Sequence, residues 1–161
     1  MASGAIRADG SSRFGKNNRW GYFPSASLAW RVSGEDFFTK AKFLSFVDDL
    51  KIRTSYGVTG NFQIGNYDHL SLMALDNYIL GTGNGQLVQG YKPNTIKNDD
   101  LSWEKNAMVN VGVDLQMFKG LLGITVDYYN TNTSNMLLNV PVPHLTGYST
   151  ALMNIGKLNN R

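Results

Sequence analysis

Residues 106–129 alternate between apolar and polar side chains in two strand-length runs, which are joined by a tight turn at Lys119 and Gly120. One face of these runs carries only apolar or aromatic side chains: Ala107, Val109, Val111, Val113, Leu115, Met117, Leu122, Ile124, Val126 and Tyr128. Successive side chains of a strand point to opposite faces, so the pattern predicts a hairpin with one apolar and one polar face. Each run is about as long as a membrane-spanning strand of roughly 9–11 residues. A soluble β-sandwich and a membrane β-barrel both fit this hairpin.

The same alternation recurs in two earlier stretches, residues 20–32 and 49–59. In the second of these, apolar side chains alternate with a set that includes Lys51 and Arg53. A further strand is predicted to end near residue 9, and residues 154–161 read as the opening of another. Residues 34–47 break the alternation and predict a helical turn. The chain is therefore predicted to be all-β and antiparallel.

The predicted connections between strands differ greatly in length. Residues 60–100 form a stretch of about forty residues rich in Gly, Asn and Tyr, and a structureless loop of that length is uncommon in a compact domain. A polar loop at residues 10–19 and another loop after Asn130 are also predicted, against the short turn at Lys119 and Gly120. Long loops on one side and short turns on the other are typical of outer-membrane barrels.

Aromatic residues are predicted to gather at two levels of the strands. Five fall near the ends that join the long loops: Trp20, Tyr22, Tyr56, Trp103 and Tyr128. Three fall near the opposite ends: Trp30, Phe46 and Phe118. Two such girdles are expected at the two interfaces of a membrane, and a sandwich has no reason to sort aromatics by level. The placement favours a barrel.

Composition excludes several classes of function. The chain has no cysteine, and its two histidines, His69 and His144, lie far apart, so no metal site, cofactor site or catalytic group is predicted. The acidic residues Asp99, Asp100 and Glu104 lack the spacing of a calcium-binding EF-hand loop. The formal net charge of +3 is too small and diffuse to indicate nucleic-acid binding. No run of about 18 apolar residues predicts a transmembrane helix.

Several stretches, in order and at matching spacing, resemble the SusC/RagA family of TonB-dependent outer-membrane transporters. They are RADGSSRFG (7–15), NRWG (18–21), FPSASLAWR (23–31), EDFF (35–38), LKIRTSYGVTGN (50–61), IGNY (64–67), LSWEK (101–105), DYY (127–129) and NIG (154–156). Each stretch alone is a weak signal, but their ordered combination is specific. The resemblance covers essentially the whole chain.

This resemblance implies an antiparallel transmembrane β-barrel of roughly 22 strands, with long extracellular loops and short periplasmic turns. Residues 1–161 would be a fragment of its later half, without the plug domain. It further implies a carrier in the outer membrane of a Gram-negative bacterium and not an enzyme. Its partners would be TonB and a SusD-like lipoprotein, and its substrates oligosaccharides or peptides.

Two sets of residues are candidates for function. Aromatic faces and polar neighbours in the loops could stack on a sugar and bond its hydroxyls, although packing within the loop explains them equally well: Trp20, Asn66, Tyr67, Asp68, Tyr78 and Tyr91. Polar side chains on the strands are expected to line the lumen: Lys51, Arg53, Asn110, Asp114 and Asp127. The loop cations Arg13, Lys16 and Arg19 beside Trp20 resemble a single-strand nucleic-acid groove, but an outer loop at the membrane interface is favoured.

Two alternatives to a large barrel remain at this point. One is a complete small outer-membrane barrel or adhesin-like surface protein, because about eight strands can close a barrel. The other is a soluble carbohydrate-binding β-sandwich.

Overall fold

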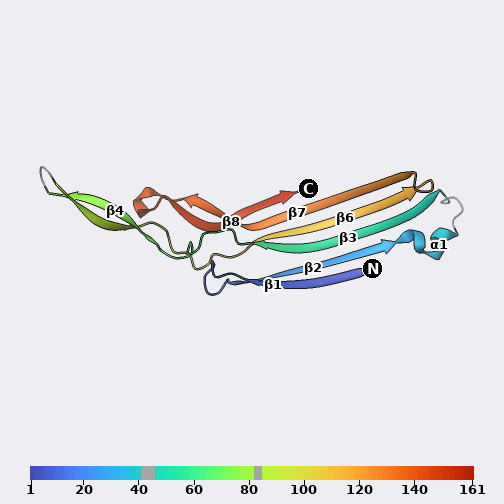
Figure 1. The fold of residues 1–161 in the computed structure, drawn as a ribbon, viewed down its shortest axis with the longest axis horizontal. Helices are drawn as coiled ribbons and strands as arrows, with labels where there is room; N and C mark the ends of the chain where they lie inside the picture. The colour runs from blue at the N-terminus through green and yellow to red at the C-terminus, as the bar shows by residue number, and fades with distance from the viewer. Residues whose placement is uncertain (41–45, 82–84) are drawn as a thin grey trace.

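One antiparallel sheet dominates the computed structural model, which describes residues 1–40, 46–81 and 85–161 (Figure 1). Its six strands lie in the order β1-β2-β3-β6-β7-β8. Their bounds are Ala2–Gly10 (β1), Trp20–Arg31 (β2), Val47–Asn61 (β3), Glu104–Met117 (β6), Leu122–Pro141 (β7) and Thr150–Asn160 (β8). The predicted antiparallel all-β fold is confirmed.

Two remaining strands, β4 (Met73–Leu80) and β5 (Gln86–Pro93), pair with each other as a separate hairpin. This hairpin projects beyond one end of the large sheet (Figure 1). We call that end the loop end, and the opposite end, with the turn at residues 118–121, the turn end. Residues 60–100, predicted as one long connection, therefore contain this hairpin.

Helical structure is confined to single turns in the described residues: η1 (Val32–Gly34), α1 (Asp36–Thr39) and η3 (His144–Thr146). The helical turn predicted within residues 34–47 is present in α1, while residues 41–45 lie outside the described part of the chain. Across the three described ranges, every helix is too short to cross a membrane.

The large sheet has one polar and one apolar face, as the alternation predicted. Ile52 lies opposite Val113, which lies opposite Val126, so these three side chains share the apolar face. Ile52 and Val126 are exposed, as is Leu28 on β2. Among the described residues no second sheet covers this face. The arrangement is therefore not a β-sandwich.

Strand β7 is much longer than predicted and ends at Pro141 instead of near Tyr129. The loop expected after Asn130 is absent, because residues 131–141 continue the ladder with β8. Alternation fails to reveal this part of the strand because Thr and Asn occupy both faces between residues 130 and 135. Because β7 continues to Pro141, Tyr128 lies within the strand, opposite Val111 of β6, and not at the strand end where it was predicted.

A bulge in β7 explains why the pattern breaks there. Asn135 has a φ of 56°, in the left-handed region that Asn tolerates better than most residues, and the register with β8 shifts around Met136. Asn154 of β8 stabilises the bulge, because its Nδ2 donates to the carbonyl oxygens of Asn135 and Ser102, both at 2.8 Å. Its Oδ1 accepts the Ser102 N–H at 2.9 Å. Asn154 thus ties β8 to β7 and to the segment that precedes β6.

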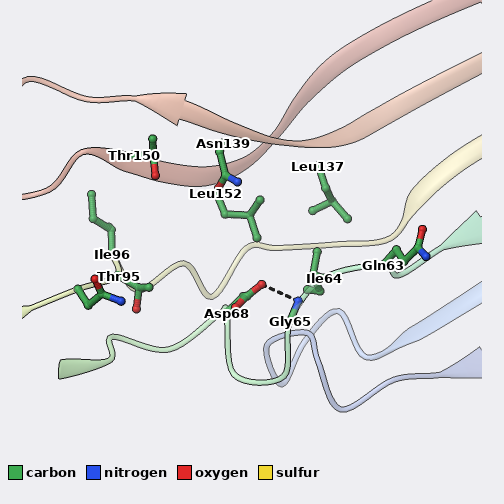
Figure 2. A pocket seen from close by; sticks show the side chains of 11 residues that line it. Gln63, Ile64, Gly65, Asp68, Thr95, Ile96, Leu137, Asn139, Thr150 and Leu152 are labelled. Carbon is green, nitrogen blue, oxygen red and sulfur yellow. Dashed lines mark hydrogen bonds between the residues drawn. The ribbon is translucent and has the colours of Figure 1, made fainter. Parts of the chain in front are cut away.

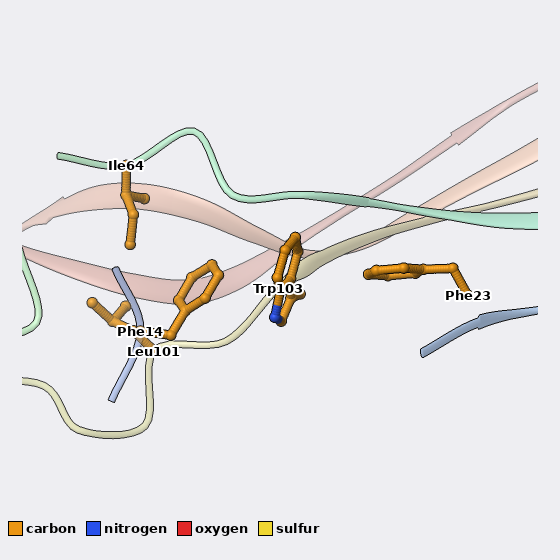
Figure 3. Packing of buried hydrophobic residues seen from close by; sticks show 5 residues of the cluster. All are labelled: Phe14, Phe23, Ile64, Leu101 and Trp103. Atoms are coloured by element: carbon orange, nitrogen blue, oxygen red, sulfur yellow. The ribbon is translucent and has the colours of Figure 1, made fainter. Parts of the chain in front are cut away.

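The buried core is a small cluster at the loop end, formed by Phe14, Phe23, Ile64, Leu101 and Trp103. Figure 3 shows the Trp103 ring between those of Phe14 and Phe23. The ring centroids lie 5.2 and 5.4 Å from that of Trp103, a spacing typical of favourable aromatic pairs. Only 3% of Trp103 is exposed, so its predicted place in an exposed aromatic girdle was wrong.

The cluster fills a gap between two strands of the sheet. Strands β2 and β3 pair only from Ser25 opposite Gly57 towards the turn end, and beyond that point they separate. The Phe23 ring occupies the space, and a Cβ atom added to Gly60 would lie 2.1 Å from Phe23 Cζ. Only a glycine at position 60 permits this contact between ring and backbone.

We predict that Gly60→Ala destabilises the protein by about 1–3 kcal/mol, the usual cost of overpacking a well-filled core. The added methyl group would force the Phe23 ring away from Trp103. The measurement is thermal unfolding followed by tryptophan fluorescence, which reports on buried Trp103.

Gly57→Ala is the matched control on the same strand, because its added Cβ would meet its nearest neighbour at 3.8 Å, an ordinary contact. Equal melting temperatures for the two variants would contradict the tight packing of Phe23 on Gly60.

Candidate functional site

A three-residue ion-pair cluster lies at the centre of the polar face of the sheet. Arg53 on β3 contacts Asp114 on β6, with 3.2 Å between Nε and Oδ2, and Asp127 on β7, with 2.8 Å between Nη2 and Oδ2. The Nη2 contact is a hydrogen bond, whereas the Nε contact is an ion pair without hydrogen-bond alignment. The side chains are 37%, 34% and 39% exposed, so each pair is partly screened by water.

Strand register explains how Arg53 reaches across the neighbouring strand. Arg53 lies opposite Gly112, and Gly112 lies opposite Asp127, so the three positions form one row across the sheet. A Cβ at Gly112 would lie 2.6 Å from Asp127 Oδ1 and 2.8 Å from Arg53 Nε. The missing side chain at position 112 therefore leaves the space in which Arg53 and Asp127 meet.

The other predicted lumen residues share this polar face. Lys51 lies opposite Asp114, one row closer to the turn end. Asn110 lies between Ser55 and Tyr129, one row closer to the loop end. The structure thus brings all five strand residues together on one face. Whether that face borders a lumen stays a prediction.

At the loop end, a pocket of about 380 Å³ opens between the β7–β8 pair and the connections on either side of the β4–β5 hairpin. We call it the amide pocket. Figure 2 shows Asn139 and Leu152 on one side and Ile64 and Asp68 on the other. Its polar lining comes from Gln63, Asp68, Asn94, Thr95, Asn139 and Thr150.

Most of these polar groups remain available to a ligand. Asp68 is engaged, because its Oδ2 accepts the Gly65 N–H at 2.6 Å, and Thr95 bonds to the backbone of Leu70 and Leu72. The side chains of Gln63, Asn94, Asn139 and Thr150 make no hydrogen bond to any other described residue. Neutral donors and acceptors around an apolar floor suit a neutral, hydroxylated molecule or a peptide backbone.

A second pocket, of about 450 Å³, lies between the β1–β2 connection and the segment after β3. We call it the arginine pocket. It is lined by Ser12, Arg13, Arg19, Asn66, Tyr67, His69 and Leu70. Two of the predicted ligand residues, Asn66 and Tyr67, therefore lie here, while Asp68 lines the amide pocket instead.

The remaining predicted ligand residues lie elsewhere. Tyr78 and Tyr91 are both exposed on the β4–β5 hairpin. Tyr91 lies opposite Leu75 and shares its face. Tyr78 is three residues after Leu75 and therefore points to the other face of the hairpin. Trp20 lies on the same apolar side of β2 as Tyr22, and its ring packs over Gly10. These three aromatics do not converge on one surface.

Within the described ranges, no group of three or more His, Asp or Glu side chains is arranged so that it could hold a metal ion. Asp99 pairs with Lys97, and Glu104 accepts hydrogen bonds from Asn61 and from the backbone of Leu137. These acidic residues are thus occupied by contacts within the protein.

Comparison with known proteins accounts for this architecture. The family model described as "TonB dependent receptor-like, beta-barrel" matches residues 1–161, the whole chain. The chain belongs to this family.

The relatives of this TonB-dependent receptor-like chain include TonB-dependent receptor P39 of Formosa agariphila, 41% identical over 161 residues, and TonB-dependent receptor SusC of Bacteroides thetaiotaomicron, 35% identical over 157 residues. They align with 100% and 96% of this chain, but only 15% of each relative's length is matched. The solved structure of the RagAB peptide importer in its "closed-closed" state aligns with a TM-score of 0.81 at 35% identity, covering 98% of this chain and 16% of that one.

Membership of the TonB-dependent receptor-like family explains the exposed apolar face. Barrel strands in this class alternate side chains towards lipid and towards the interior, so neither face needs a second protein layer. The six-stranded sheet is a part of such a barrel that is not closed on itself.

Sequence reasoning missed the pocket residues on β7 and β8 and before β6. Asn94, Asn139 and Thr150 are distant in sequence and lie in stretches without alternation, so no local signal points to them. Arg13 and Arg19 stood out as cations, but their neighbour His69 did not.

We predict a measurable but small coupling between Arg53 and Asp127. A double-mutant cycle of Arg53→Ala and Asp127→Ala should give about 1 kcal/mol or less, because the side chains are more than a third exposed. Unfolding of the detergent-purified protein is the measurement, and added salt should reduce the coupling.

Lys51 supplies the matched control, since it lies on the same strand and face yet makes no ion pair with a described residue. The control is a double-mutant cycle of Lys51→Ala and Asp127→Ala. If its coupling energy equals that of Arg53 and Asp127, the ion pair between Arg53 and Asp127 does not account for the coupling.

Proposed function

We propose that residues 1–161 form part of a TonB-dependent importer in the outer membrane of a Gram-negative bacterium. The imported molecules are oligosaccharides or peptides, and a SusD-like lipoprotein assembles with the receptor on its outer side. The observation that supports this most is the match of the whole chain to one barrel family, together with a sheet whose apolar face is uncovered.

The printed names support part of this proposal. One relative is named a TonB-dependent receptor, SusC, and a similar solved structure is named a peptide importer. The oligosaccharide class rests on the resemblance to the SusC/RagA family. The chain spans about 15% of the length of the curated relatives it matches. We therefore propose the plug and the TonB-contacting segment from the resemblance of this chain to those relatives.

The two faces of the sheet receive different roles in this proposal. The apolar face contacts lipid. The polar face, with Lys51, Arg53, Asn110, Asp114 and Asp127, lines the interior of the barrel. The short turn at residues 118–121 lies on the periplasmic side, and the loop end with both pockets lies outside the cell.

Ligand contact is proposed for the loop end. Asn66, Tyr67 and Asp68 line its two pockets, and Tyr78 and Tyr91 offer separate aromatic faces on the projecting hairpin. Trp20, on the apolar side of β2, is better suited to the membrane interface.

The two alternative functions have less support. A small closed barrel needs its edge strands to pair, whereas β1 and β8 are the two unpaired edges of the described sheet. A soluble sandwich needs a second layer over the apolar face, and the β4–β5 hairpin lies beyond the end of the sheet instead of over it.

Deletion of the gene in its host tests the proposed import. We expect the deletion strain to lose growth on one class of oligosaccharide or peptide as the sole carbon source. The wild-type gene should restore growth, and loss of TonB should abolish it. Unchanged growth on every oligosaccharide and peptide offered, with no lipoprotein co-purifying with the receptor, would refute the proposal.

The amide pocket yields a second test in the same receptor. We expect Asn139→Ala to weaken binding of the imported molecule by about fivefold to tenfold, the usual effect of losing one or two neutral hydrogen bonds. Binding is measured by titration calorimetry.

Asn77→Ala is the control, because Asn77 is an amide on the β4–β5 hairpin and does not line the pocket. Equal binding by the wild type and the Asn139→Ala variant would remove the amide pocket from the binding site.

A further inference from the structure

The arginine pocket contains positive charge that no carboxylate of the described residues neutralises. Elsewhere on the sheet Arg7, Arg31 and Arg53 each contact a carboxylate, at 2.8–3.2 Å. Arg13 and Arg19 make no ion pair with any described residue.

Arg13 is held in place by neutral groups. Its Nε donates to Asn66 Oδ1 at 3.1 Å, its Nη1 donates to the Phe62 carbonyl oxygen at 3.4 Å, and its guanidinium lies over the Phe62 ring, 5.4 Å from the centroid. These contacts fix the guanidinium at the pocket without cancelling its charge. The remaining N–H groups are available to a ligand, and a guanidinium binds carboxylate and sulfate groups well.

Arg19 lies in the same pocket with a free side chain. Its backbone carbonyl accepts hydrogen bonds from Ser11 N–H and Trp103 Nε1, which anchor the main chain. Its exposed guanidinium contacts no other described side chain in an ion pair or hydrogen bond. The backbone of Arg19 is thus fixed, and its guanidinium group is available to a ligand.

Tyr67 supplies a further feature of the pocket that points to a ligand. His69 also lines the pocket, but its Nδ1 is enclosed by the protein and offers no donor to a ligand. Tyr67 has a φ of 73°, in the left-handed region that disfavours a bulky residue, and strain of this kind concentrates at functional sites. The exposed Tyr67 ring lines the same pocket as Arg13 and Arg19 and offers a flat face to a ligand.

The nearest acidic residue in sequence does not neutralise the pocket. Asp68 follows Tyr67, but its carboxylate accepts the Gly65 N–H and lines the amide pocket. The arginine pocket therefore combines two cations that no described carboxylate compensates with an exposed aromatic face.

We propose that the arginine pocket binds the acidic group of an imported oligosaccharide, a carboxylate or a sulfate on a sugar ring. Arg13 and Arg19 bind the oxyanion, and the sugar ring stacks on Tyr67. This inference rests on the import function proposed above and specifies its cargo as an acidic glycan.

The test measures binding to the receptor that contains this chain, purified in detergent and freed of lipopolysaccharide. The probes are trigalacturonate, its neutral methyl ester and a sulfated disaccharide. We expect at least one acidic probe to bind and the methyl ester not to bind. Arg19→Gln should raise the Kd of that acidic probe about tenfold, the usual effect of losing a charge-assisted contact.

Lys16→Gln is the matched control, because it removes the same charge from the same loop at a position that does not line the pocket. Its Kd should stay within about twofold of the wild type, since an exposed distant charge is largely screened at physiological salt. Equal weakening by Arg19→Gln and Lys16→Gln would reduce the effect to general electrostatics and overturn the proposal.

Three other outcomes also overturn it. They are the absence of binding by both acidic probes, equal binding of trigalacturonate and its methyl ester, and Arg19-dependent binding of triglutamate or of lipid A vesicles but of neither acidic sugar. Each is distinguishable from failure of the import proposal, because the growth phenotype of the deletion strain does not depend on the charge of the cargo.

Discussion

The uninterrupted ladder between β3 and β6 is the constraint on which the rest of the structure depends. It runs without a shift from Asp49 opposite Gln116 to Asn61 opposite Glu104. Because side chains alternate with a period of two, a slip of one residue would turn every apolar side chain of β3 to the polar face. The ladder therefore fixes the lipid-compatible surface of β3 and, together with the β6–β7 ladder, the row in which Arg53, Gly112 and Asp127 meet.

The aromatic cluster performs the corresponding role at the loop end. The ladder cannot hold segments that lie beyond the paired strands, and the packing of Phe14, Ile64 and Leu101 around Trp103 connects them to the sheet. Both pockets border this cluster: Ile64 lines the amide pocket, and Phe62, which packs on Trp103, supports Arg13. The positions of the pockets thus follow from burial of a few aromatic rings.

The sequence predicts the parts of the fold that depend on local period. Arg53 and Asp127 could be assigned to polar faces from their own strands, and the alternation in residues 106–129 predicted β6 and the first half of β7. The second half of β7 could not be predicted, because its strand conformation depends on pairing with β8 and its register changes at the bulge around Asn135. The pockets could not be predicted either, because Asn94 and Asn139 meet only through long-range packing.

The distribution of charge separates the sheet from its loops. On the strands, Arg7, Arg31 and Arg53 have carboxylate partners, whereas Lys51 makes no ion pair with a described residue, so most but not all of this positive charge is compensated within the protein. At the loop end, Arg13 and Arg19 have none among the described residues. A wall with compensated charge holds a passing anion weakly, whereas uncompensated guanidinium groups bind it. Under the proposed import function, charge selection therefore occurs where the cargo is captured, and the wall below it can release what the loops have bound.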